Sequence, residues 1–207
     1  MKFKIINSDK RLYKLNIPVI GLTGGVATGK STVSQILRQN NFPVICADSL
    51  VKQVYLMKKT INHLQKMNPE FVINQKINFK KLRKDFFSNN EIKLKIEKYI
   101  YAHLEEVFNL EIQNFPDAKY IIYDIPLLFE KNINKIVDLT ICVYSTSEQQ
   151  LNRLVKRDSI NEELALKIIS SQINIEDKAK KSDYVIQNTS NIEELRDKID
   201  QFITKYL

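Results

Sequence analysis

The most informative residues of the chain form one short segment, GGVATGKS at positions 24–31, which fits the pattern G-x-x-x-x-G-K-[ST]. All four glycines of the 207-residue chain fall between positions 21 and 29, and glycine lets a ligand approach the backbone closely. In such a segment successive N–H groups form a nest for an anion, and the following helix directs its positive end to the same place. Lys30 is placed to contact the β- and γ-phosphates, and the Ser31 hydroxyl to bind Mg²⁺. The segment therefore predicts a site for a nucleoside triphosphate together with Mg²⁺.

Two carboxylates follow apolar runs, where a phosphoryl-transfer reaction could use them. Asp48 comes after the run at 42–47, so it would lie beside the phosphate loop and act as base for an acceptor hydroxyl. The alternative is that Asp48 is only the N-cap of the next helix. Asp124 closes the run YIIYD, which is the pattern of a carboxylate held near Mg²⁺ or of a turn residue at a strand end.

Two arginines, Arg153 and Arg157, lie four residues apart on one predicted helix face. Guanidinium groups on a mobile lid are suited to neutralise the transferred phosphoryl group. The same spacing is also common on plain solvated helices, so both interpretations stay open.

The elements that must position these residues alternate between strands and helices. Compact apolar runs rich in β-branched residues predict five strands, at 17–23, 42–47, 119–125, 138–144 and 183–187. Helical patterns separate them, so we expect an α/β fold with a parallel sheet of about five strands flanked by helices. The expected nucleotide-binding core comprises 17–50 and 116–207, with a lid at about 146–175. A helical acceptor subdomain is expected at 51–115, and 1–16 form an N-terminal extension.

Two helices have apolar faces that can be predicted. A long helix in the inserted region is expected to bury the residues Ile92, Ile96, Tyr99, His103, Val107 and Leu110. The last helix is expected to begin at Ser190, three residues before Glu193, as a capping box. Its core-facing stripe would consist of Ile192, Leu195, Ile199, Phe202 and Ile203.

Composition limits the class of protein. The chain is 43% hydrophobic and 27% charged, which is typical of a globular protein with a sizeable core. It has no run near the roughly 18 apolar residues of a membrane span, and its N-terminus lacks the apolar middle of a signal peptide. We therefore expect a cytoplasmic protein without a membrane partner.

Cys46 and Cys142 lie in apolar runs and are expected to be reduced thiols. The net charge of +8 favours anionic partners but does not separate nucleic acid from a phosphorylated small molecule.

Phosphate loops also serve GTPases and motor ATPases, and the sequence argues against both. A GTPase is expected to carry N-K-x-D, whereas NKIVD at 134–138 is one residue too long. A motor ATPase normally needs a longer chain. A short β-α-β protein with a helical insertion favours a small-molecule kinase.

These residues together resemble the dephospho-coenzyme A kinase family, over nearly the whole chain after residue 16. The resemblance rests on the segments GLTGGVATGKSTV, ICADSLVKQV, DIPLLFE, QQLNRLVKRD and KSDYVIQN. It implies that ATP phosphorylates the 3′-hydroxyl of the ribose of dephospho-coenzyme A, giving coenzyme A and ADP, with no nucleic-acid partner. In that family's terms Asp48 corresponds to the base, Arg153 and Arg157 to the lid, and Asn188 to the loop near the adenine. With the motif residues, the predicted catalytic set is Asp48, Lys30, Arg153 and Arg157, and the predicted Mg²⁺ ligands are Ser31 and Asp124. The predicted ATP contacts are the loop residues Gly25, Ala27, Thr28, Gly29, Lys30, Ser31 and Thr32, to which the resemblance adds Asn188.

The sequence departs from the family on the acceptor side. Cys46 stands where the family usually has Asp, Lys52 where it usually has Arg, and Glu105 where an Arg helps to hold the acceptor. A reversed charge at Glu105 predicts weak acceptor binding. Two alternatives stay open: a kinase of another small hydroxyl compound of the nucleoside or shikimate type, and a non-catalytic ATP-binding module.

Overall fold

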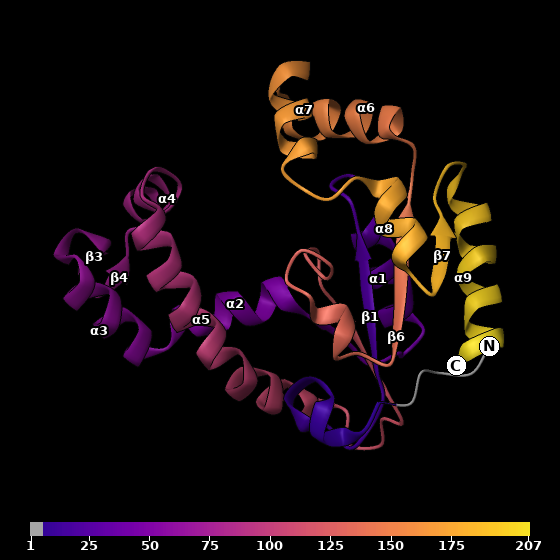
Figure 1. The fold of residues 1–207 in the computed structure, drawn as a ribbon, viewed down its shortest axis with the longest axis horizontal. Helices are drawn as coiled ribbons and strands as arrows, with labels where there is room; N and C mark the ends of the chain where they lie inside the picture. The colour runs from indigo at the N-terminus through magenta and orange to yellow at the C-terminus, as the bar shows by residue number, and fades with distance from the viewer. Residues whose placement is uncertain (1–5) are drawn as a thin grey trace. The chain divides into compact units, whose positions relative to one another are not determined.

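The computed structural model describes residues 6–207, and the chain divides into two compact units (Figure 1). The first unit consists of Met1–Ile45 with Asp117–Leu207, and the second of Cys46–Pro116. Among the described residues no helix is long and apolar enough to cross a lipid bilayer.

The first unit is built on a five-stranded parallel sheet with the order β2-β5-β1-β6-β7. Its strands are β1 (Val19–Gly24), β2 (Val44–Cys46), β5 (Ile121–Asp124), β6 (Leu139–Tyr144) and β7 (Tyr184–Gln187). The central strand β1 is buried at every position, because helices cover both faces of a parallel sheet and only apolar runs tolerate that environment. In the register Leu22 lies opposite Asp124 on β5, and Gly24 opposite Val143 on β6. The predicted fold class is confirmed.

The helices of the first unit are α1 (Lys30–Gln39), α6 (Ser147–Asp158), α7 (Glu162–Ser170), α8 (Ile175–Lys181) and α9 (Ile192–Tyr206). They fall into two groups: α1, α8 and α9 contact strands of the sheet, and α6 and α7 pack on each other. Figure 1 shows α9 alongside β7, and Ile199 and Phe202 of this helix are fully buried in the core cluster with Ile186.

The start of α9 differs from the prediction. The N-cap is Asn191, whose side chain accepts a hydrogen bond from Glu194 N–H, so the capping box predicted at Ser190 is wrong by one residue. Both residue types cap helices well, and the sequence alone did not separate them. Because the helix begins one residue later, Ile192 lies in its first turn and is exposed rather than core-facing.

The second unit is mainly helical, with α2 (Ala47–Leu56), α3 (Lys58–Met67), α4 (Phe79–Ser88) and α5 (Asn90–Glu111). It also holds a two-stranded antiparallel hairpin, β3 (Val72–Ile73) and β4 (Lys76–Ile77), which the sequence did not predict because each strand has only two residues. The long helix is present, but its buried residues are Ile96, Ile100, Leu104, Val107 and Phe108. The predicted face was rotated, since Leu110 is exposed and Tyr99 and His103 are half-buried.

The segment before β1 is held by a buried ion pair. The Arg11 guanidinium donates to both oxygens of Asp138, at 2.7 and 2.9 Å, and these two side chains are almost entirely buried. Asp138 also accepts from the backbone N–H of Val19 at 2.8 Å, so this pair fixes the first residue of the central strand. The predicted extension therefore contacts the sheet unit from residue 6 onward, and its first five residues lie outside the described ones.

Candidate active site

The phosphate loop leaves β1 at Gly24 and enters α1 at Lys30 through two residues with left-handed backbone. Ala27 has φ of +59° and Gly29 has φ of +90°. At Gly29 a side chain would also collide with the Asn188 amide, so this position combines a positive φ with a close approach. Alternation of right- and left-handed residues turns successive N–H groups inward as an anion nest. The first turn of α1 adds N–H groups that have no partner within the helix.

Lys30 and Asp124 form an ion pair at this loop. Lys30 Nζ contacts Asp124 Oδ1, and the Ser34 hydroxyl donates to Asp124 Oδ2 at 2.6 Å. Asp124 ends β5, the strand next to β1, which is why its buried carboxylate reaches the loop. Ser34 was not predicted. It lies one turn after Ser31 on the buried side of α1, and a hydroxyl within an apolar helix face could have indicated a buried polar contact.

Asn188 and Arg153 join the loop to α6. The Asn188 amide donates to the Thr28 carbonyl oxygen at 2.8 Å, and Arg153 Nη2 donates to the Asn188 carbonyl oxygen at 3.0 Å. The other terminal nitrogen of Arg153, Nη1, is buried and has no hydrogen-bond partner within the described residues. A buried, unpaired guanidinium nitrogen is costly in free energy, so Arg153 has the capacity to bind an anion here. Thr28 itself is buried, and its hydroxyl bonds the Gly25 carbonyl oxygen.

Arg157 lies one turn further along α6 and is exposed. It forms an ion pair with its neighbour Asp158, with N–O distances of 2.7 and 2.9 Å. This hydrogen bonding raises the pKa of Arg157 and lowers the pKa of Asp158. The two predicted lid arginines are therefore in different environments, and only Arg153 contacts the elements around the loop.

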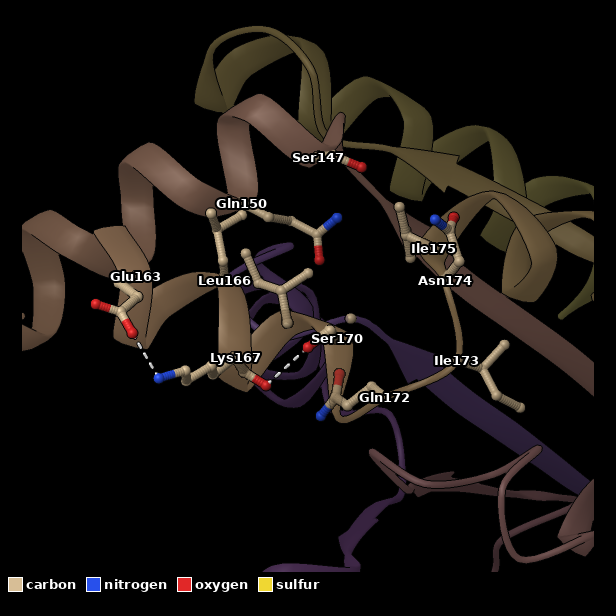
Figure 2. Close-up of a pocket in the computed structure, with 12 residues that line it drawn as sticks. Ser147, Gln150, Glu163, Leu166, Lys167, Ser170, Gln172, Ile173, Asn174 and Ile175 are labelled. Atoms are coloured by element: carbon tan, nitrogen blue, oxygen red, sulfur yellow. Dashed lines mark hydrogen bonds and ion pairs between the residues drawn. The ribbon is translucent and has the colours of Figure 1, made fainter. Parts of the chain in front are cut away.

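A cavity of about 600 Å³ lies next to the loop, between α6, α7 and the connection to α8 (Figure 2). Its lining includes Gly25 of the loop, Gln150 of α6 and Leu166 of α7. Gln172, which the figure shows beside the connection, accepts a hydrogen bond from the Val26 N–H at 3.0 Å. The α6–α7 helices thus enclose a space that opens directly onto the phosphate loop.

Asp48 belongs to the second unit, in the first turn of α2, and it is exposed. The N-cap of α2 is Cys46, without a side-chain cap bond, so the interpretation of Asp48 as an N-cap is wrong. Asp48 lines a second cavity of about 640 Å³ together with Lys52 and Arg83. The apolar part of this cavity consists of Val51, Tyr55, Leu56, Phe79, Leu82, Phe86 and Phe87.

The aromatic residues of this second cavity form ordered contacts. Tyr55 and Phe79 meet edge to face with ring centroids 5.5 Å apart, and the Lys93 ammonium lies 5.8 Å from the Phe86 ring centroid. Burial raises the pKa of the Tyr55 hydroxyl. Phe87 is 81% exposed, so the cavity presents uncovered apolar surface beside charged groups. This cavity was not predicted, although the segment FKKLRKDFFS at 79–88 carries paired aromatic and basic residues.

The donor set at the loop fits Mg²⁺ better than a softer metal. The Ser31 hydroxyl is in the exposed first turn of α1, and the Asp124 carboxylate is held by Lys30 and Ser34. Mg²⁺ binds oxygen, and in nucleotide sites it takes one or two protein ligands with phosphate and water. Within residues 6–207 no group of three His, Cys, Asp or Glu side chains could hold a metal alone, and both cysteines are free thiols.

One charged residue near the loop was missed entirely. Lys178 lies in a lysine-rich run at 178–181, a pattern typical of a solvated helix face, yet it is completely buried. It forms an ion pair with Glu130 at 2.8 Å. Ile175, three residues earlier on the same buried helix face, is the signal that could have indicated this.

A parallel sheet with a phosphate loop after its central strand, and a carboxylate at the end of the neighbouring strand, defines a P-loop nucleotide-binding protein. A family model described as Dephospho-CoA kinase matches residues 18–194. The chain belongs to the dephospho-CoA kinase family.

Relatives named dephospho-CoA kinase agree with this assignment, and two solved structures share the fold. A dephospho-CoA kinase from Fusobacterium nucleatum is 40% identical over 190 residues, covering 91% of this chain and 98% of that protein. One from Listeria innocua is 34% identical over 195 residues, covering 91% and 96%. The solved dephospho-CoA kinase of Campylobacter jejuni superposes with a TM-score of 0.66 at 27% identity, covering 90% of this chain and 96% of that one. TT1252 from Thermus thermophilus superposes with a TM-score of 0.82 at 25% identity, covering 93% and 100%.

Proposed function

We propose that this kinase transfers the γ-phosphoryl group of ATP to the 3′-hydroxyl of the ribose of dephospho-coenzyme A, giving coenzyme A and ADP. The observation that carries the proposal is the phosphate loop with its Lys30–Asp124 pair in a chain that matches the family model over residues 18–194. The reaction forms a bond between the acceptor oxygen and the γ-phosphorus and breaks the bond to the β–γ bridging oxygen.

The loop residues bind the triphosphate. Backbone N–H groups of residues 25–32 would surround the phosphates, and Lys30 would exchange Asp124 for the β- and γ-phosphate oxygens. Ser31 and Asp124 would then hold Mg²⁺, which neutralises phosphate charge. Arg153 would direct its unpaired Nη1 to the transferred group, and Arg157 would join it when its exposed pair with Asp158 opens. Asn188 would lie near the adenine.

The second cavity is the proposed acceptor site. Dephospho-coenzyme A combines a diphosphate with a long pantetheine arm, so its site needs cations and an apolar wall. Lys52 and Arg83 supply the cations and Phe79 and Phe86 part of the wall. Asp48 in the same cavity would take the proton of the 3′-hydroxyl as the new bond forms.

The test is an acceptor panel with ATP and Mg²⁺, read as ADP release and as product mass. Dephospho-coenzyme A should gain one phosphoryl group, whereas shikimate and nucleosides should not react. Transfer to another acceptor would refute the acceptor assignment and leave a P-loop kinase of different specificity. ATP binding without transfer to any acceptor would favour the non-catalytic alternative. Because both ATP and dephospho-coenzyme A are water-soluble nucleotides, we expect such an enzyme to work in the cytoplasm.

A further inference from the structure

Lys178 on α8 is a buried cation outside the set of residues proposed for catalysis. Its side chain is 0% exposed, and lysine is almost never fully buried unless it is paired. The Nζ atom lies 2.8 Å from Glu130 Oε1, 3.0 Å from the Pro126 carbonyl oxygen and 3.3 Å from the Gly24 carbonyl oxygen. An ammonium group has three N–H donors, so each of them has an acceptor.

Two of these acceptors belong to the strand ends that carry the site. Gly24 ends β1 and begins the phosphate loop, and Pro126 follows Asp124 by two residues at the end of β5. The Thr23 hydroxyl also donates to the Pro126 carbonyl oxygen, at 3.1 Å. Lys178 therefore joins the exits of the two strands from which the loop and Asp124 extend.

The third acceptor, Glu130, connects this cation to the end of the α6–α7 helices. Its Oε1 also accepts the backbone N–H of Ile173 at 3.1 Å, while the adjacent Gln172 side chain binds the Val26 N–H of the loop. Glu130 Oε2 is buried and has no partner among the described residues. An unpaired buried acceptor costs free energy, so stability alone is a poor explanation for this pair.

We propose that Lys178 and Glu130 are positioning residues that couple the α6–α7 helices to the phosphate loop during phosphoryl transfer. The proposal rests on the proposed function. Lys178 holds the Gly24 carbonyl, and with it the first peptide of the loop, while Glu130 holds Ile173, where the chain returns from α7. A displacement of the α6–α7 helices is thereby transmitted to the loop that binds the phosphates.

The decisive variant is Lys178→Met with Glu130→Met. Lys178→Met alone leaves a buried carboxylate without its cation and should lower the melting temperature, because breaking a buried pair is strongly destabilising. The double variant removes both charges and should recover most of that loss. Its kcat should nevertheless stay about 10- to 100-fold below wild type, since small displacements of reacting groups cost that much. Its Kd for MgATP should rise roughly three- to tenfold, which is the change expected from the loss of one hydrogen bond. The KM of the acceptor should not change.

Two controls separate positioning from plain stability. Lys180→Met removes an exposed lysine from the same helix and should change neither stability nor kcat. Arg11→Met breaks the buried pair with Asp138, which fixes the opposite end of β1. It should lower the melting temperature as Lys178→Met does, but leave kcat at the wild-type value in assays run below the unfolding transition.

A double variant with wild-type kcat and wild-type MgATP affinity overturns the proposal, because the pair would then be only structural. If the double variant does not fold, Glu130→Met is compared with Glu130→Gln, which keeps the acceptor oxygen and removes only the charge. A kcat lowered more in Glu130→Met than in Glu130→Gln supports the coupling, and a wild-type kcat in Glu130→Met overturns it. A wild-type protein that does not phosphorylate dephospho-coenzyme A refutes the proposed function, and calorimetric titration with MgATP still tests the pair.

Discussion

The ion pair between Lys30 and Asp124 allows a prediction in which stability and activity separate. Lys30→Met removes the cation from a pair whose side chains are 12% and 4% exposed. Breaking a buried pair typically costs about 3–5 kcal/mol, and the hydrogen bond from Ser34 to Asp124 remains, so we expect the lower end, about 3 kcal/mol. For a chain of this size 1 kcal/mol shifts the melting temperature by about 2–4 °C. The predicted shift is therefore about 6–12 °C downward.

The same change removes positive charge from the triphosphate, which should lower kcat about 10²–10³-fold. Adding Asp124→Asn should restore most of the melting temperature, because no buried charge is then left unpaired, but it cannot restore kcat. Scanning calorimetry of the ligand-free protein and ADP release at saturating ATP measure the two quantities. Lys59→Met, which breaks an exposed pair with Glu106, is the matched control and should leave both unchanged.

Two results would refute this reasoning in different ways. A kcat within twofold of wild type for Lys30→Met would show that Lys30 does not stabilise the transferred phosphate. An unchanged melting temperature would show that the pair with Asp124 contributes nothing to the folded state.

Four further predictions concern single positions. Asp48→Asn should lower kcat by about 10²-fold or more with unchanged MgATP affinity and melting temperature, since Asp48 caps no helix; wild-type kcat would exclude it as the base. Arg153→Lys and Arg157→Lys should both lower kcat because the planar guanidinium group, which can donate two parallel hydrogen bonds, is lost. Only Arg153→Lys should also lower the melting temperature, and full activity in both variants would show that neither arginine acts on the phosphoryl group. Glu105→Arg should lower the KM of the acceptor at unchanged kcat, and an unchanged KM would mean that this exposed residue lies away from the acceptor. Cys142 should resist alkylation at pH 8 in the folded protein, because burial raises the pKa of its thiol from 9.0 to about 12, and rapid labelling would contradict this. The free energy of unfolding should fall as the pH rises above 9, because only the unfolded thiol ionises there.

The sheet and the phosphate loop were predictable because their signals are local. A fully buried parallel strand needs a continuous apolar run, and an anion nest needs glycine and a following lysine and hydroxyl at fixed spacing. Asp124 could be found in the same way, since it closes such a run. These positions depend on neighbours in the sequence, so one sequence is enough.

Other features depend on partners that are distant in the chain. The burial of Lys178 could not be predicted because its three acceptors, on Gly24, Pro126 and Glu130, come from segments about 50 to 150 residues away. The face of α5 was misjudged because isoleucines and aromatic residues occur all around the helix, and only packing against α2 and α4 selects Ile96, Ile100 and Leu104. The aromatic cavity escaped notice for the same reason, since α2 and α4 supply its two sides.

The place of β1 in the sheet has a consequence for the order in which the protein forms. Val19 pairs with Ile121 on one side, and Ile20 with Leu139 on the other, so both neighbours of the central strand are made about a hundred residues later. At roughly 5–20 residues per second, synthesis leaves this apolar strand without a partner for about 5–20 seconds. Closing so long a loop costs roughly 3 kcal/mol more than closing a five-residue turn, whereas the inserted helices gain mostly local contacts. We therefore expect the inserted unit to fold on the ribosome before the sheet, and the phosphate loop to become competent for ATP only after β5 and β6 have emerged.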